Sequence, residues 1–232
     1  MMYLRKSDER GEADHGWLKA KHSFSFSSYY DNRYLGFRDL RVINEDQVLG
    51  GGGFPTHSHK DMEIVTYILE GALEHKDSMG TGSIIRPGDV QYMSAGSGVN
   101  HSEFNHSKTD RVHLLQIWIL PEKQGGSPRY DQKHFAEADR TNQLRLIASH
   151  DGRDNSISIR QNASLYASLL ESGKTVTHEI AEGRHVWLQL ARGKLEVNGE
   201  PIEAGDGLAF VKESTIEIKG TEKAEFILFD LA

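Results

Sequence analysis

Hydrophobic residues of this chain gather in many short runs, none longer than nine residues. The runs are rich in Val, Ile, Tyr and Trp, and turn-forming residues separate them, as expected for β-strands joined by turns. Many short strands at such spacing predict an all-β fold, either a sandwich or a barrel. We expect strands over residues 40–43, 63–69, 83–86, 90–95, 112–120, 156–161, 164–170, 185–190, 194–197, 207–211, 216–219 and 224–231.

Three other segments complete this outline. Asn198-Gly199 lies between two short strand-like runs and favours a two-residue hairpin turn. The best helical candidate is short and covers residues 133–140. Residues 121–132 contain Gly, Pro and polar residues, which is typical of a connection between larger units.

The chain contains an internal repeat. "YILEGALEH" followed by "RPGDVQYM" in the first half is similar to "LQLARGKLEV" followed by "EAGDGLAF" in the second half. In each half a strand ends at a glycine, and a Gly-Asp turn then opens another strand. We therefore predict two tandem antiparallel β-barrels, an N-terminal one over residues 1–130 and a C-terminal one over residues 131–232.

The two halves differ in their histidines. When the repeat is aligned without gaps on Gly71 and Gly193, His57 falls opposite Glu179, and the pair formed by His57 and His59 has no counterpart. A scaffold common to both halves would not need this pair. Its presence in one half predicts a dedicated site in the N-terminal barrel.

Four residues form the candidate site. Alternate side chains of a strand share one face, so His57 and His59 point the same way if their segment is extended. The same holds for His101 and Glu103. Three imidazoles and one carboxylate suit a first-row divalent metal and leave positions open for a substrate or oxygen, whereas zinc held by all four would be closed and structural.

Composition narrows the chemistry. The chain has 232 residues and no cysteine, which excludes disulfides, thiolate ligands and cysteine nucleophiles. Its net charge of −7 gives no indication of nucleic-acid binding. No apolar stretch is long enough to span a bilayer, and the N-terminus lacks the apolar region of a secretory signal, so we expect a cytoplasmic protein.

Two motifs resemble those of cupins. "GGGFPTHSHKDMEIVTYILEG" is similar to the first cupin motif, and "GDVQYMSAGSGVNHSEFN" is similar to the second. Ser94 stands where proline is usual, and the gap from Gly96 to His101 is longer than the common pattern. These departures, together with the segment at 15–46, resemble the pirin family of bicupins. The resemblance runs from about residue 3 to the C-terminus and implies a tandem pair of double-stranded β-helix barrels.

The resemblance also implies the ligand set. In pirins one metal is held in the N-terminal cupin by three His and one Glu, which here correspond to His57, His59, His101 and Glu103. Glu63 is then not a ligand, and we expect its carboxylate to orient a histidine N–H. We interpret the remaining histidines and aromatic residues near the site as structural. His22 could line the mouth of the pocket or bond to backbone, and we favour the bond to backbone. Phe26 and Trp118 are expected in the core.

A metal-dependent dioxygenase is the function that the resemblance implies. It would cleave a flavonol in the manner of quercetin 2,3-dioxygenase, consuming O2 and releasing carbon monoxide. The flavonol 3-oxygen would bind the metal, and Glu103 would act both as ligand and as general base. We expect Fe(II), with Ni, Co, Cu, Mn or Zn as alternatives.

Two other classes of function remain. One is a non-enzymatic, iron-dependent regulator that binds a transcription factor or a metabolic enzyme, since pirin-like proteins are also known as such partners. The other is a structural zinc protein without oxygen consumption. As partners we expect a flavonol-like aromatic molecule and O2, a protein in the regulatory alternative, and neither nucleic acid nor membrane. We expect a monomer.

Overall fold

The computed structural model describes all residues from 1 to 232, and most of its regular structure is β-strand. Helical structure is confined to α1 (Glu137–Arg140) and to two 3-10 turns at Ser7–Glu9 and Arg153–Asn155. The predicted all-β class is confirmed. No helix of the chain is both long and apolar enough to cross a membrane.

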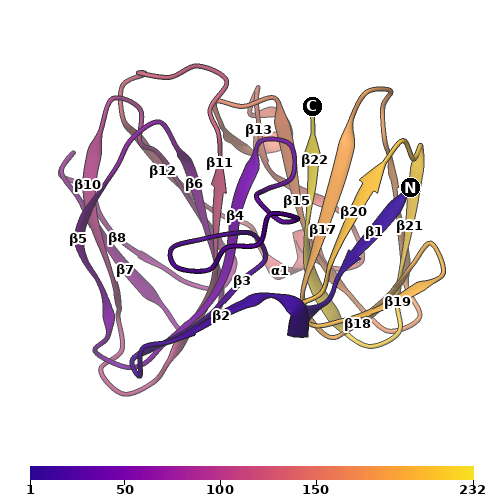
Figure 1. Cartoon of the computed structure of the whole chain (residues 1–232), viewed down its shortest axis with the longest axis horizontal. Coiled ribbons are helices and arrows are strands. Elements are labelled where there is room, and N and C mark those ends of the chain that lie inside the picture. Colours follow the sequence, from indigo (N-terminus) through magenta and orange to yellow (C-terminus); the bar gives the residue numbers. More distant parts are fainter. The chain divides into compact units, whose positions relative to one another are not determined.

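The chain forms two compact units (Figure 1). We call residues 11–134 with 159–161 the N-terminal barrel, and residues 1–10, 135–158 and 162–232 the C-terminal barrel. This division departs from a boundary at residue 130, because β1 (Met2–Arg5) pairs with β20 (Gly207–Val211) while β12 (Arg129–His134) pairs with β9 (Asp89–Ser94). Each of these strands pairs with the edge of a sheet. Such an edge exists only in the folded barrel, so the pattern of hydrophobic residues does not predict which strand will pair with it.

The N-terminal barrel consists of a seven-stranded and a four-stranded sheet. The larger sheet has the order β12-β9-β6-β11-β4-β3-β2, and the smaller has the order β5-β10-β7-β8. Besides β9 and β12, the strands of this barrel are β2 Gly11–Asp14, β3 Leu18–His22, β4 Leu40–Val48, β5 Gly53–His59, β6 Glu63–Glu70, β7 Leu73–Asp77, β8 Gly82–Ile85, β10 Val99–Asn105 and β11 Val112–Ile119.

The C-terminal barrel repeats this arrangement. Its sheets have the orders β1-β20-β17-β22-β15-β13-β14 and β16-β21-β18-β19. All strand pairs are antiparallel except β13 with β14, which is parallel. The further bounds are β13 Arg145–Ser149, β14 Ile157–Ser158, β15 Ala163–Leu170, β16 Thr175–Glu179, β17 His185–Arg192, β18 Lys194–Val197, β19 Glu200–Glu203, β21 Thr215–Gly220 and β22 Ala224–Leu231.

Most predicted strands are present within a few residues of their expected bounds. The prediction for 156–161 is wrong beyond β14, because the chain leaves the sheet there and the backbone N–H of Arg160 donates to Glu63 at 3.0 Å. The helix predicted at 133–140 begins only at Glu137, since β12 continues to His134. The hairpin at Asn198-Gly199 is confirmed by the β18–β19 register and by positive φ at both residues.

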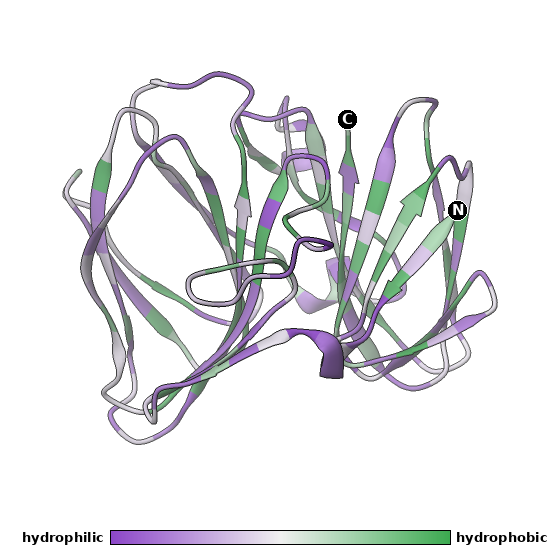
Figure 2. Cartoon of the chain, viewed as in Figure 1, coloured by the Kyte–Doolittle hydropathy of each residue, from purple (hydrophilic) through white to green (hydrophobic).

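The two barrels share a skeleton but not an interior. Strand register places His178, rather than Glu179, at the position of His57, because His178 lies seven positions before the start of β17, whereas His57 lies six positions before the start of β6. His178 binds Asp230 at 2.9 Å, and the position of His101 is taken by the buried Ile216. Figure 2 shows hydrophobic segments along the strands of both barrels. The large apolar cluster of the C-terminal barrel fills the space that the N-terminal barrel leaves for polar groups.

Gly96 occupies the turn between β9 and β10, with φ 48°. A Cβ atom there would overlap the carbonyl oxygen of Gly126, and the Gly96 carbonyl accepts the N–H of Asp61 at 2.9 Å. We expect Gly96→Ala to lower the free energy of unfolding by more than about 2 kcal/mol, measured by urea denaturation. Gly80→Ala is the control, because Gly80 also has positive φ but faces open space, and it should lose only about 1 kcal/mol. Equal losses would mean that the close approach at Gly96 is unimportant.

Candidate metal centre

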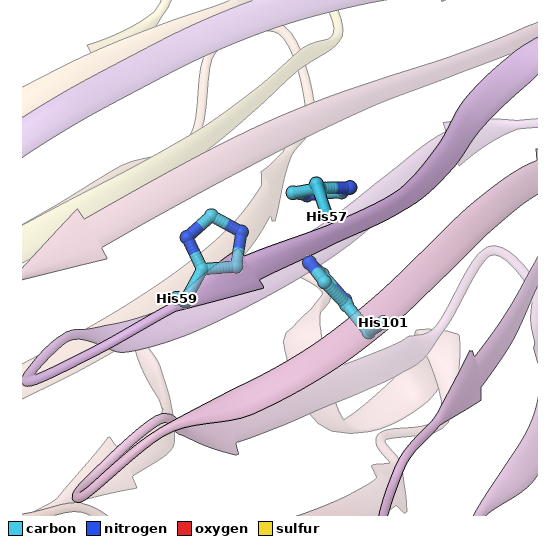
Figure 3. Close-up of side chains that lie close together, drawn as sticks. All are labelled: His57, His59 and His101. Atoms are coloured by element: carbon cyan, nitrogen blue, oxygen red, sulfur yellow. The ribbon is translucent and has the colours of Figure 1, made fainter.

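Three histidines converge inside the N-terminal barrel (Figure 3). β5 and β10 are antiparallel neighbours, and His57 lies opposite His101 in their register. The ring centroids of His57 and His59 lie 4.4 Å and 4.8 Å from that of His101. One ring nitrogen from each of the three lies within 4.8 Å of the other two. The strands thus bring together all three histidines singled out in the sequence.

Glu103 lies two residues further along β10, beyond a register shift in its pairing with β5. Its carboxylate forms a second group of potential ligand atoms with His101 and with His75, again within 4.8 Å of one another. His101 therefore belongs to both groups. Gln116 on β11 donates from Nε2 to Glu103 Oε2 at 2.9 Å and fixes the carboxylate in the barrel interior.

Two buried atoms of the candidate ligands lack a hydrogen-bond partner. They are Nε2 of His101 and Oε1 of Glu103. Unpaired polar atoms in a protein interior are costly and point to a missing ligand. Burial and the neighbouring histidines lower the pKa of His59 to about 4 and that of His101 to about 2, so both rings are neutral and offer a lone pair. The donor set fits a divalent cation.

The carboxyl of Glu103 is the one acidic group in this set. Burial raises its pKa to about 7, and the side-chain amides of Gln116 and Gln91 oppose that rise. A bound cation would favour the ionised form, because a nearby positive charge offsets the loss of hydration.

A cavity of about 350 Å³ adjoins the histidines. Aromatic and aliphatic side chains make up much of its wall, and polar groups stand at a few points, as in many small-molecule sites. Its lining residues are Leu18, His22, Phe26, Asn44, Asp46, Phe54, Pro55, Thr56, His57, His59, Glu103, Gln116 and Trp118.

Three of these residues were assigned differently from the sequence. His22 does not serve only the backbone, because its Nδ1 lies 2.7 Å from Oδ1 of Asn44 and its ring lines the cavity. Phe26 and Trp118 line the cavity, and Trp118 packs edge-on against His59 as well as against the apolar cluster that contains Ile64. Apolar cavity walls and apolar cores have the same sequence pattern, so only the folded barrel separates the two.

Glu63 is buried, but it orients no histidine. It accepts hydrogen bonds from Ser94 Oγ at 2.6 Å, from the Tyr92 hydroxyl and from the Arg160 N–H. The expectation that it binds a histidine N–H is wrong. The chain turns between β5 and β6, with positive φ at Asp61, so the alternation of faces along β5 does not continue to Glu63.

His75 is the residue at this site that the sequence analysis missed. It is fully buried, its Nε2 donates to Asp77 Oδ2 at 3.0 Å, and its ring stacks on Tyr130. Its Nδ1 lies 3.5 Å from Nδ1 of His101. The alternation of Leu73, His75 and Asp77 after a turn glycine was the available signal, since it places all three on one face of β7.

Comparison with known proteins agrees with this architecture. The chain matches the pirin family over residues 3–119 and the quercetinase C-terminal cupin domain over residues 146–231. A protein of Escherichia coli K12 named quercetin 2,3-dioxygenase is 48% identical over 231 residues, which is 100% of this chain and 99% of that protein. A pirin-like protein of Caulobacter vibrioides is 42% identical over the full length of both chains.

Solved structures agree as well. The crystal structure of the bacterial pirin YhhW from Escherichia coli in complex with nickel(II) matches with a TM-score of 0.95 at 48% identity, covering 100% of this chain and 99% of that one. The expected two-domain cupin fold is confirmed, and the donor set together with the nickel complex supports a divalent metal. From the match over residues 3–119 and the similarity along the whole length, this chain belongs to the pirin family.

Proposed function

We propose that this chain is a metal-dependent dioxygenase that cleaves a flavonol of the quercetin type with O2 and releases carbon monoxide. The observation that carries the proposal is the pair of unpartnered buried donors, His101 Nε2 and Glu103 Oε1, at a largely apolar cavity. A relative with 48% identity named quercetin 2,3-dioxygenase supports the same reaction class.

His57, His59, His101 and Glu103 would hold the metal. We propose Fe(II), while the nickel(II) complex of the bacterial pirin supports nickel as an alternative. When bound, a redox-active divalent ion would bring the flavonol and O2 together and lower the pKa of the flavonol 3-hydroxyl.

Glu103 would take the proton of that hydroxyl. A bound cation would keep the Glu103 carboxylate ionised, and an ionised carboxylate can accept a proton. Gln116 occupies Oε2, which leaves Oε1 as the oxygen directed to the site. A general base needs to lie within hydrogen-bond reach of its proton, and Glu103 lines the cavity beside the histidines.

The cavity would position a flat aromatic substrate. Phe26, Phe54 and Trp118 supply ring surfaces that keep water away from the donors. Asn44 and Asp46 add polar groups that suit the hydroxyls of a polyphenol. A planar, hydroxyl-bearing molecule matches this combination of walls.

Carbon monoxide release tests the proposal. Protein reconstituted with Fe(II) is incubated anaerobically with quercetin, oxygen is added, and carbon monoxide is measured per flavonol lost. We expect close to one carbon monoxide per flavonol from the wild type and none from His101→Ala. His106→Ala is the matched control, because His106 is exposed and pairs with Glu74, away from the site. Absence of carbon monoxide from wild type with a fully occupied site would refute the reaction and favour the regulatory alternative.

A further inference from the structure

A row of buried groups leads from the candidate metal donors away from the cavity. Asp77 Oδ2 lies 3.0 Å from His75 Nε2, and His75 Nδ1 lies 3.5 Å from His101 Nδ1. The side chains of His75 and Asp77 are fully buried, and neither residue lines the cavity. The far nitrogen of His101, Nε2, is the unpartnered one. The row therefore ends at the atom that would face the metal.

The proton positions along this row follow from the chemistry of each group. A carboxylate only accepts hydrogen bonds, so Nε2 of His75 carries the proton that faces Asp77. A neutral imidazole has one proton, which leaves Nδ1 of His75 as an acceptor. Nδ1 of His101 then carries the proton that faces His75, and Nε2 of His101 carries a lone pair.

We propose that Asp77 and His75 are positioning residues that fix His101 as the tautomer protonated on Nδ1 and so hold its Nε2 ready to bind the metal. The inference rests on the metal centre proposed above. Histidine ligands generally donate their second ring nitrogen to an acceptor, which orients the ring and strengthens the ligand. Here the acceptor is another histidine, itself held by a carboxylate.

Asp77 is itself held in place by its other oxygen. Oδ1 accepts the backbone N–H groups of Met79 at 2.9 Å and of Thr81 at 3.0 Å, in the turn between β7 and β8. In Asp77→Asn the amide oxygen can keep both turn contacts. The amide NH2 then replaces Oδ2 and faces His75 as a donor. His75 must accept through Nε2 and donate through Nδ1, which moves the proton of His101 onto Nε2, the metal-facing atom.

The first test is the tautomer of His101 in the metal-free protein, from ¹⁵N chemical shifts and couplings of the imidazole rings. We expect protonation on Nδ1 in the wild type and on Nε2 in Asp77→Asn. Protonation on Nε2 in the wild type, or no change in the variant, would overturn the proposal. This readout needs neither metal nor substrate.

The second test is the affinity for Zn²⁺, measured by competition with a chelator. We expect Asp77→Asn to weaken binding by about 10- to 100-fold, the range found for groups that support metal ligands. Asp89→Asn is the matched control, because Asp89 also holds a turn through one oxygen and a histidine, His134, through the other, but His134 is an exposed residue and not a candidate ligand. Its affinity should stay within twofold of wild type.

A double variant separates this mechanism from a general loss of structure. His75→Leu removes the link, so adding Asp77→Asn to it should change the Zn²⁺ affinity by less than twofold, although the same change weakens wild type strongly. Additive losses would overturn the proposal. So would a second bound Zn²⁺ that disappears in His75→Leu, because the two Nδ1 atoms would then be ligands.

These outcomes are independent of the proposed reaction. A wild type that binds metal, shows the expected tautomers and releases no carbon monoxide would refute the dioxygenase and leave the positioning role intact. Carbon monoxide release from wild type together with unchanged tautomers and affinity in Asp77→Asn would refute the positioning role alone.

Discussion

Glu103→Gln is expected to abolish carbon monoxide release and, at the same time, to make the metal-free protein more stable at neutral pH. The carboxylate is buried in the proposed metal site. A bound ion would contact it there, and without the ion its neighbours are side-chain amides. Glutamine cannot take a proton from the substrate and is a poor ligand, so turnover should fall below detection. It also carries no charge to bury, so the metal-free fold should gain stability.

The pH dependence of this gain has a defined sign. In the folded, metal-free protein burial raises the pKa of Glu103 from its ordinary value of 4.5 to about 7. The folded state therefore binds more protons than the unfolded chain between these values, and stability falls as pH rises through that window. The contribution of neutral Glu103 is fully present below pH 4.5 and is lost above about pH 7. The loss amounts to about 3 kcal/mol.

Urea denaturation of wild type and Glu103→Gln, both stripped of metal, measures the effect at a series of pH values from 4.5 to 8. The variant should become more stable relative to wild type by about 3 kcal/mol across this range. Glu12→Gln, at an exposed carboxylate paired with Lys21, should follow the wild-type curve. Curves for wild type and Glu103→Gln that remain parallel at all pH values would show that the carboxyl is not buried as described. Saturating metal should reverse the order of stability, since the wild type binds it more tightly.

Many of the strands could be predicted because β-branched and aromatic residues favour strands and occur here in short runs. The strands that were missed, such as β3 and β16, mix charged and apolar residues, since one face of each is exposed. The edge strands β1 and β12, and the strands with which they pair, were not predicted either. Pairing at an edge depends on which backbone groups remain free after folding, and that is a property of the whole barrel.

The convergence of His57, His59 and His101 was predictable because two strands with alternating side chains bring their inward residues together. The supporting groups were not. Gln116 and His75 lie on β11 and β7, and the local sequence does not predict that their side chains contact Glu103 and His101. Strand register supplies that information, as it also supplies His178 as the counterpart of His57.

The register also identifies an equivalent pair of positions at which the interiors of the two barrels differ. Gln116 lies opposite Thr66 on β6, and Leu228 lies opposite Leu188 on β17 at the matching place in the C-terminal barrel. Gln116 lines the cavity and bonds to Glu103, whereas Leu228 is fully buried in an apolar cluster. At this position one interior carries a polar side chain that bonds to a candidate ligand, and the other carries an apolar side chain packed among apolar neighbours.

Leu228→Ala should therefore lower the free energy of unfolding by about 2–5 kcal/mol and leave the metal affinity of the folded protein unchanged. The substitution opens a void among close-packed side chains that cannot relax fully. Gln116→Ala enlarges an existing cavity instead, so it should lower stability by only about 1 kcal/mol but weaken metal binding through Glu103. Urea denaturation and Zn²⁺ competition on both variants measure the two effects. A change in metal affinity in Leu228→Ala would show that Leu228 does more than pack the C-terminal barrel. An unchanged metal affinity in Gln116→Ala would show that Gln116 does not support metal binding.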